Sequence, residues 1–417
     1  MAQAGGGLEM KSIYKGGIIL LLGFIFLKMG GVLFRIICMG VLPVEAYGEV
    51  ALFLVIFNWL VLFGTLNVTI GLAKFVSQKG KDRDLYYKAA LSGSVLLSLA
   101  VSAVLFVFSP FVASLLNMSI TTIHWAALCI PFAAVYNTGI FYFRGLYKMG
   151  KSVTTDALMM AARICMLSVL LAAGLYYAPF VAFLASFVAV DAYLLLKNRI
   201  RANFDFRKTL SAYRMLLVYS LPIFAGEFLR AFSVGLDRVM IAGFYSTAEA
   251  GFYDVAVALC LGYVIIANSY SNALLPSASR NQADIKKRKH ELRKAAKACT
   301  FLFAAYTALL LLAGAPVINM INPAYLGVFS FIIPLAGAYI IFGFLSLLCF
   351  YSSSIGQQKN SAYAMAVFAF LSLALNFYLI PQMLYGGAVT ALAVSSSVSI
   401  MLLGALAWRS EGKESQD

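Results

Sequence analysis

The positions of the basic residues constrain this chain more than any other feature. Twelve apolar segments can be drawn along its 417 residues, each near the roughly 20 residues that a bilayer-crossing helix needs. Of the 32 Lys and Arg residues, 27 lie at one set of segment ends, and the six intervening loops contain none. This alternation is the positive-inside pattern of a polytopic membrane protein, so both termini are predicted to face the cytoplasm.

The composition supports the same reading. The chain is 62% apolar and its mean hydropathy is +0.88, outside the range of soluble proteins. The predicted spans are 18–42, 50–73, 89–109, 122–143, 153–178, 180–196, 215–243, 252–278, 295–313, 326–351, 361–380 and 384–408. The sequence therefore predicts an all-α polytopic protein of the cytoplasmic (inner) membrane with 12 transmembrane helices. The net charge of +15 reflects topology and attraction to anionic lipid headgroups, so no nucleic-acid partner is expected.

An internal repeat divides the chain. A shift of 203 residues superimposes Leu33, Arg35, Gly40 and Gly48 on Leu236, Arg238, Gly243 and Gly251. The repeat predicts two pseudo-symmetric six-helix bundles around a central cavity, an N-terminal one of residues 1–200 and a C-terminal one of residues 201–417. In transporters with such repeats, substrate sites lie between the halves, which rock against each other to give alternating access.

One motif match is misleading. Residues 145–152 fit the phosphate-loop pattern G-x-x-x-x-G-K-S, but that loop works between a strand and a helix of an α/β domain. Here it joins two predicted membrane spans, so we expect a cytoplasmic hairpin and no ATP binding. The six cysteines lie in spans without C-x-x-C spacing and the two histidines are isolated, so neither a metal site nor a cofactor is expected.

Five cations lie inside the predicted spans: Lys28, Arg35, Arg163, Arg230 and Arg238. A cation in hydrocarbon is costly, so these side chains are expected to face protein or water. In the span 215–243, four charged residues fall within about 100° of arc and form one polar face: Glu227, Arg230, Asp237 and Arg238. A cavity with surplus positive charge favours an anion, and a diphosphate pairs with Arg and Lys through charge-assisted hydrogen bonds.

The intramembrane acids suggest coupling to an ion. A carboxylate beside a cation can take up a proton or a sodium ion when an anionic substrate leaves. The candidates are Glu227, Asp237 and Asp254, with H+ or Na+ as the coupling ion. Other roles stay open: Arg35 and Arg238 are near enough to the outer ends of their spans to snorkel, and Glu227 is spaced for a structural ion pair with Arg230.

Several stretches resemble a known family. The segment from Arg35 to Val50, with Gly40, Tyr47 and Gly48, is similar to the turn between the first two helices of the O-antigen-type polysaccharide flippases. These belong to the multidrug/oligosaccharidyl-lipid/polysaccharide (MOP) exporter superfamily. Further similar stretches are 63–75, 251–256, 273–276 and 354–359. The resemblance implies two six-helix bundles around a cavity lined by the first, second, seventh and eighth helices. It also implies a flippase, not an enzyme, that moves polyprenyl-diphosphate-linked oligosaccharides from the cytoplasmic to the outer leaflet.

Two rival functions remain. Drug antiporters of the same superfamily favour cations through carboxylates, whereas this chain holds five intramembrane cations against three candidate acids. Membrane glycan polymerases or ligases use the same lipid donors but usually carry a sizeable outer domain, and the outer loops here are short and free of Lys and Arg. Twelve spans fit the O-antigen branch better than the fourteen of lipid II flippases. We expect a monomer whose partners are membrane lipids and the lipid-linked glycan.

Overall fold

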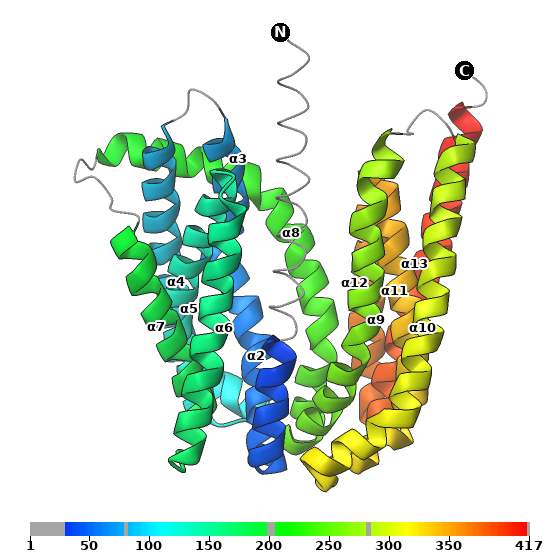
Figure 1. The fold of residues 1–417 in the computed structure, drawn as a ribbon, viewed down its shortest axis with the longest axis horizontal. Helices are drawn as coiled ribbons and strands as arrows, with labels where there is room; N and C mark the ends of the chain where they lie inside the picture. Colours follow the sequence, from blue (N-terminus) through cyan, green and yellow to red (C-terminus); the bar gives the residue numbers. More distant parts are fainter. Residues whose placement is uncertain (1–29, 79–81, 198–204, 281–284, 415–417) are drawn as a thin grey trace. The chain divides into compact units, whose positions relative to one another are not determined.

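The computed structural model describes residues 30–78, 82–197, 205–280 and 285–414, and within these ranges the regular elements are helices (Figure 1). A short helix, Gly30–Val41, comes first. The elements that follow are α2 (Val44–Thr65), α3 (Val68–Ser77), α4 (Arg83–Leu115), α5 (Ile120–Gly145), α6 (Met149–Ala172), α7 (Ala178–Lys197), α8 (Phe206–Phe244), α9 (Thr247–Arg280), α10 (Ile285–Ile321), the 3-10 helix η1 (Pro323–Ser330), α11 (Ile332–Ser354), α12 (Gln358–Met383) and α13 (Tyr385–Glu414).

Eleven of the described helices are long and apolar enough to cross a membrane, namely α2 and α4 to α13. They correspond one for one to the predicted spans from 50–73 to 384–408, so the all-α polytopic fold is confirmed for the described part of the chain. The first predicted span, 18–42, lies partly outside the described residues, as does Lys28. The count of twelve therefore stays a prediction.

Polar side chains define several helix starts. The Asp82 carboxylate accepts a hydrogen bond from the backbone N–H of Leu85 at the start of α4 (3.0 Å). The Ser119 hydroxyl accepts one from Thr121 at the start of α5 (3.2 Å). Such caps satisfy N–H groups that have no partner within the helix.

The prediction of one continuous helix over residues 50–73 is wrong, because this segment forms two helices, α2 and α3. Leu66 and Asn67 adopt left-handed backbone conformations, with φ of 43° and 54°. Asn tolerates this region, whereas Leu rarely adopts it. The break therefore needs support from tertiary packing, which the apolar pattern does not reveal.

Two helices begin nine or ten residues earlier than predicted. Helix α8 begins at Phe206 and not at 215, and α10 begins at Ile285 and not at 295. The added turns of α8 are amphipathic, since Thr209 and Ala212 are buried while Arg207 and Lys208 are exposed. A search for continuous apolar segments misses such turns because only one face is buried.

The chain divides into two compact units. Unit 1 contains residues 30–43 and Phe53–Phe228, and unit 2 contains Val44–Leu52 and residues 229–414. Helices α2 and α8 thus each contribute residues to both units. The predicted bundles of residues 1–200 and 201–417 stay a prediction, since the units reflect packing and not the sequence repeat.

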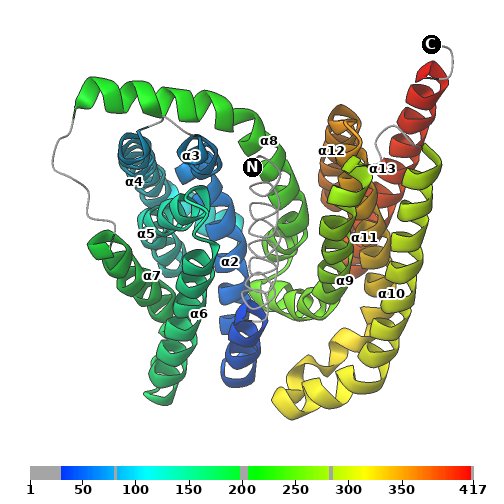
Figure 2. The same cartoon turned by 45° about the horizontal axis from the view of Figure 1, so that its top comes forward.

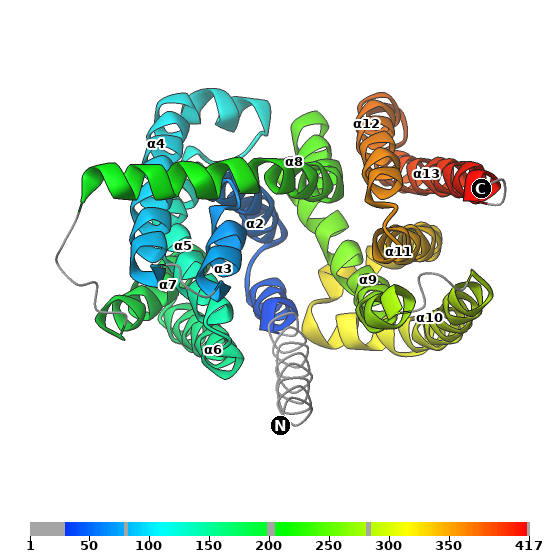
Figure 3. The ribbon, with the colours of Figure 1, turned by 90° about the horizontal axis from the view of Figure 1, so that it is seen from above.

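In unit 1, the first part of α8 lies across α3 and α4 (Figures 2 and 3). Its Ala212 and Leu216 are buried in an apolar cluster with Val68, Leu72, Val76, Tyr86, Tyr87, Ala89, Ala90 and Leu91. Gly93 of α4 allows this close packing, because a Cβ atom there would lie 2.1 Å from the ring of Tyr213. Burial of this face holds the first part of α8 on unit 1.

In unit 2, the first turns of α2 and α9 meet at two glycines. A Cβ atom on Gly48 would lie 1.9 Å from the carbonyl oxygen of Thr247, and one on Gly251 would lie 2.7 Å from the Cα atom of Gly48. Only glycine lets two backbones approach so closely. Gly48 and Gly251 are also the pair that the 203-residue shift superimposes, so equivalent positions of the repeat touch.

Candidate functional site

A buried charged cluster in unit 2 joins three of the predicted site residues. The Arg238 guanidinium lies 3.2 Å from Asp254 Oδ1 and 3.7 Å from Asp237 Oδ1. It also donates a hydrogen bond to the backbone oxygen of Val234 (3.1 Å). Asp254 has no exposed surface, and its other carboxylate oxygen accepts a hydrogen bond from the hydroxyl of Tyr47 (2.9 Å). Helices α2, α8 and α9 thus meet at one ion-paired cluster.

The cluster pairs Arg238 with two acids from within the protein. Two carboxylates flank one guanidinium, so the group carries no surplus positive charge for an anion. Removing one partner of a buried ion pair typically costs about 3–5 kcal/mol. These contacts favour a structural role for Arg238 and Asp254. Their predicted roles in substrate binding and ion coupling stay predictions.

A small enclosed cavity lies beside Asp237. Its volume is about 10 Å³, close to the space that one water molecule needs. It is lined by Ser233, Val234, Asp237, Tyr339, Phe342, Ser372, Asn376, Ala388 and Leu392. The side-chain amide of Asn376 donates to the Ser372 hydroxyl (3.1 Å), while its carbonyl oxygen is buried with no hydrogen-bond partner among the described residues. Oxygen donors therefore converge on this cavity, although the described residues contain no group of three or more His, Cys, Asp or Glu arranged to hold a metal.

Arg163 in unit 1 is enclosed by aromatic rings. Its guanidinium carbon lies 3.6 Å from the ring centroid of Phe183 and 5.1 Å from that of Phe187. Its Nε donates to the hydroxyl of Ser186 (3.2 Å). A desolvated cation over aromatic faces gains about 2 kcal/mol, which partly compensates for its removal from water. Arg163 is thus packed between α6 and α7, and its predicted role in substrate binding stays a prediction.

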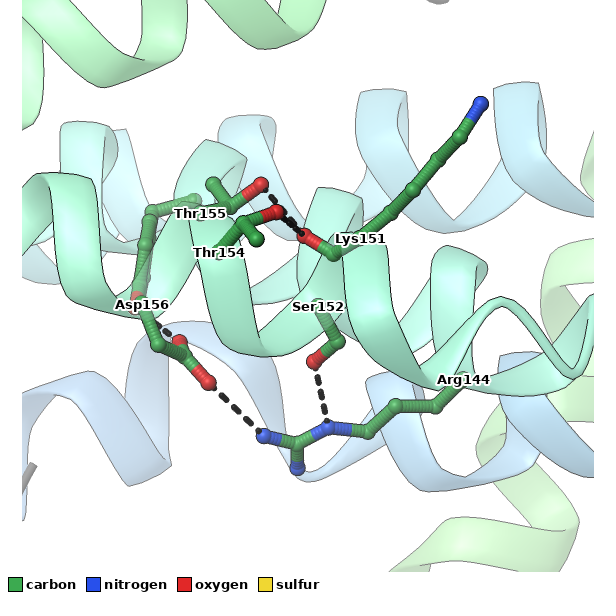
Figure 4. A network of polar contacts seen from close by, with 7 residues as sticks. Arg144, Lys151, Ser152, Thr154, Thr155 and Asp156 are labelled. Carbon is green, nitrogen blue, oxygen red and sulfur yellow. Dashed lines mark hydrogen bonds and ion pairs between the residues drawn. The ribbon is translucent and has the colours of Figure 1, made fainter. Parts of the chain in front are cut away.

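The phosphate-loop match folds as the predicted hairpin between α5 and α6. Gly145 ends α5, and residues 150–152 lie in the first turns of α6. The Arg144 guanidinium donates to the Ser152 hydroxyl (3.0 Å) and to an oxygen of Asp156 (3.4 Å) (Figure 4). The Lys151 side chain points away from these groups in Figure 4. The pattern residues therefore support a helix–helix turn.

Sequence reasoning missed the Arg144–Asp156 pair. Asp156 is buried and also accepts a hydrogen bond from the Tyr136 hydroxyl. The available signal was an arginine at the end of one predicted span and an acid at the start of the next. Asp191 of α7 was likewise not among the predicted site residues. Both of its carboxylate oxygens are buried without a hydrogen-bond partner among the described residues.

The other predicted residues differ in their exposure. Arg35 on the helix Gly30–Val41 is half-buried, as is Glu227 of α8, while Arg230 of α8 is exposed. Lys28 lies outside the described residues. A shared role for the predicted cations stays a prediction.

Comparison with known proteins gives one family and one fold. Residues 40–323 match the family of polysaccharide biosynthesis proteins. No curated protein matches the chain. Among solved structures, the lipid II flippase MurJ has a TM-score of 0.74 and 15% identity, covering 93% of this chain and 86% of that chain.

Two further structures agree. A multidrug resistance MATE family transporter of the MOP superfamily has a TM-score of 0.73 and 15% identity, over 94% of this chain and 98% of that one. A MOP superfamily transporter from Pyrococcus furiosus has a TM-score of 0.59 and 14% identity, over 94% of each chain. At such identities the likeness shows the fold, and the fold is the one that the sequence resemblance implied. Because the family match covers more than half of its residues, the chain belongs to the polysaccharide biosynthesis protein family and has the fold of the MOP superfamily transporters.

Proposed function

We propose that this membrane transporter moves polyprenyl-diphosphate-linked oligosaccharides from the cytoplasmic to the outer leaflet by alternating access. The observation that carries the proposal is the match of residues 40–323 to the polysaccharide biosynthesis protein family. Arg230, whose side chain is exposed, adds a cation at the centre of the predicted span 215–243. A cation at this depth is expected to face water, an anion or other protein groups, because hydrocarbon cannot solvate it. A diphosphate group is an anion of the right chemistry, and membership of a polysaccharide biosynthesis family supports a lipid-linked sugar.

The burial of the predicted cations suggests that some bind substrate and others stabilise the fold. Arg35 and Arg230 are only partly buried or exposed, so we assign them, together with Lys28, to the substrate diphosphate. Arg163 and Arg238 are buried and contact rings or carboxylates, so we assign them to holding their own unit together. This assignment narrows the predicted binding set to three residues.

We also propose that transport is coupled to H+ or Na+. The cavity beside Asp237 supports this, because a carboxylate and the carbonyl oxygen of Asn376 offer ligands to a small cation. Glu227 is the second candidate, since it is half-buried and near Arg230 in sequence. In reconstituted vesicles, Asp237→Asn or Glu227→Gln should retain substrate binding and lose the dependence of transport on an ion gradient. Wild-type transport without any gradient dependence would contradict the coupling.

The main test compares two arginines of the same helix. Arg230→Gln should abolish transport of a fluorescent lipid-linked oligosaccharide across vesicle membranes while membrane insertion persists, since a neutral residue inserts more easily by about 2.5–3.5 kcal/mol. Arg207→Gln, an exposed arginine before the predicted span, is the matched control and should transport at the wild-type rate. Transport by Arg230→Gln at the wild-type rate would remove Arg230 from the site. Transport of an organic cation by the wild type would instead favour the antiporter alternative.

A further inference from the structure

Unit 1 carries an open groove that none of the roles above uses. Residues of α8 between 211 and 223 and the ring of Phe75 on α3 border a space of about 810 Å³. Most of its lining is apolar, including Met215, Val218 and Ile223. The opposite face of α8 is buried against α3 and α4, so the groove lies on the face that the described residues of unit 1 leave open, where Val218 is 64% exposed.

Two cations accompany this apolar surface. Arg214 lines the groove and is exposed. The ammonium of Lys74 lies 3.7 Å from the ring centroid of Tyr219, which is also a lining residue. Within the described part of the chain, no Asp or Glu lines the groove, so the charged side chains found at it are basic. An apolar trough with positive groups fits a molecule with an anionic head and an apolar chain.

The position along the predicted topology matches such a molecule. Lys74 and Arg214 belong to the basic groups predicted at the cytoplasmic ends of their spans, at the depth of lipid headgroups. From Arg214 to Ile223 the helix extends by about 13 Å, which is long enough to run from a headgroup contact along the first units of an apolar chain. A lipid of the cytoplasmic leaflet can therefore place its phosphate near Arg214 and its chain along Val218 and Ile223.

We propose that this groove docks the diphosphate and the first isoprenoid units of the lipid-linked substrate before transport. Two cations match the two or more negative charges of a diphosphate better than the single charge of a phosphodiester lipid, which selects the isoprenoid carrier over bulk phospholipid. The ligand's identity rests on the proposed function. The described lining residues of the groove include neither Arg35 nor Arg230 nor a member of the Arg238 cluster.

Photolabelling tests the groove directly. The full chain in phosphatidylcholine nanodiscs is incubated with a sugar-free polyprenyl diphosphate that carries a photoreactive group near its diphosphate, and the labelled peptides are mapped by mass spectrometry. We expect label on the peptide containing residues 211–223. The double variant Lys74→Gln with Arg214→Gln should reduce this label at least tenfold, and Arg207→Gln should leave it unchanged.

A second pair of variants tests the apolar part. Val218→Trp fills the groove and should also remove the label, whereas Leu210→Trp on an exposed position outside the groove should not. Unchanged labelling in both groove variants would overturn the proposal, as would equal competition by phosphatidylglycerol. Label that persists in Arg230→Gln supports a site separate from Arg230. If the groove is labelled but the wild type transports no lipid-linked sugar, the docking stands and the proposed function fails.

Discussion

The glycine contact between α2 and α9 makes the sharpest prediction for stability. Gly48→Ala would place a Cβ atom 1.9 Å from the carbonyl oxygen of Thr247, more than 1 Å closer than ordinary contact allows. Both sides of this contact are backbone, so a rotamer change cannot relieve it, and the first turns of the two helices must separate. Overpacking of this kind costs about 1–3 kcal/mol, sometimes more.

Two opposing effects set the expected size. Alanine favours a helix over glycine by up to about 1 kcal/mol, which offsets part of the steric cost. Separation of the helices also weakens the hydrogen bond from Tyr47 to Asp254, and a hydrogen bond to a charged group contributes about 1.5–3 kcal/mol. We therefore expect Gly48→Ala to destabilise unit 2 by about 2–3 kcal/mol.

The assay is thermal unfolding of the purified protein in detergent. Samples are heated to a series of temperatures, and the fraction of protein that stays monodisperse is measured after each. The matched control is Gly337→Ala on α11, where a Cβ atom meets nothing within 4 Å, and it should unfold at or slightly above the wild-type temperature. If Gly48→Ala unfolds at the same temperature as Gly337→Ala, the close approach of α2 and α9 is refuted.

Three further predictions use other residues. In a background without the native cysteines, Asn117→Cys should react with a membrane-impermeant thiol reagent in intact cells, and Tyr147→Cys should not. The reverse labelling pattern would overturn the predicted topology, which places residue 117 outside and residue 147 in the cytoplasm. Asp254→Ala should lower the unfolding free energy by about 3–5 kcal/mol, because Arg238 loses a partner in a buried site, and unchanged thermal stability would contradict the ion pair. Asp191→Leu should raise the unfolding free energy by about 1–3 kcal/mol, because methyl groups of similar shape replace two buried oxygens that have no hydrogen-bond partner among the described residues. A lower thermal midpoint than that of the wild type would count against the burial of Asp191.

The spans could be predicted because each is a run of apolar residues and because basic residues mark their ends. The charge pattern also indicated which residues lie inside the membrane region. The partners of those residues could not be predicted. A helical period shows that Asp237 and Arg238 share a face, but it does not show that Asp254 of the next helix and Tyr47 of α2 complete the cluster. Such pairs depend on tertiary packing between distant segments.

The local backbone conformation also could not be predicted, because it too depends on tertiary packing. The break between α2 and α3 depends on a left-handed Leu66, and leucine gives no sequence signal for that conformation. The phosphate-loop match at residues 145–152 shows that a pattern can also suggest a site that is not there. The pattern indicates phosphate binding only between a strand and a helix, and here it lies between two helices. Only the position of this pattern between two apolar spans identified it as a hairpin.

The apolar cluster under the first part of α8 also sets an order for assembly in the membrane. Leu91 of α4 is synthesised about 120 residues before Ala212 of α8, its partner in the cluster. At about 5–20 residues per second, α8 follows roughly 6–24 s later. During this interval the apolar face of α3 and α4 has only lipid or an insertion factor to cover it. Slowing synthesis between α7 and α8 therefore lengthens the time for which unit 1 is incomplete.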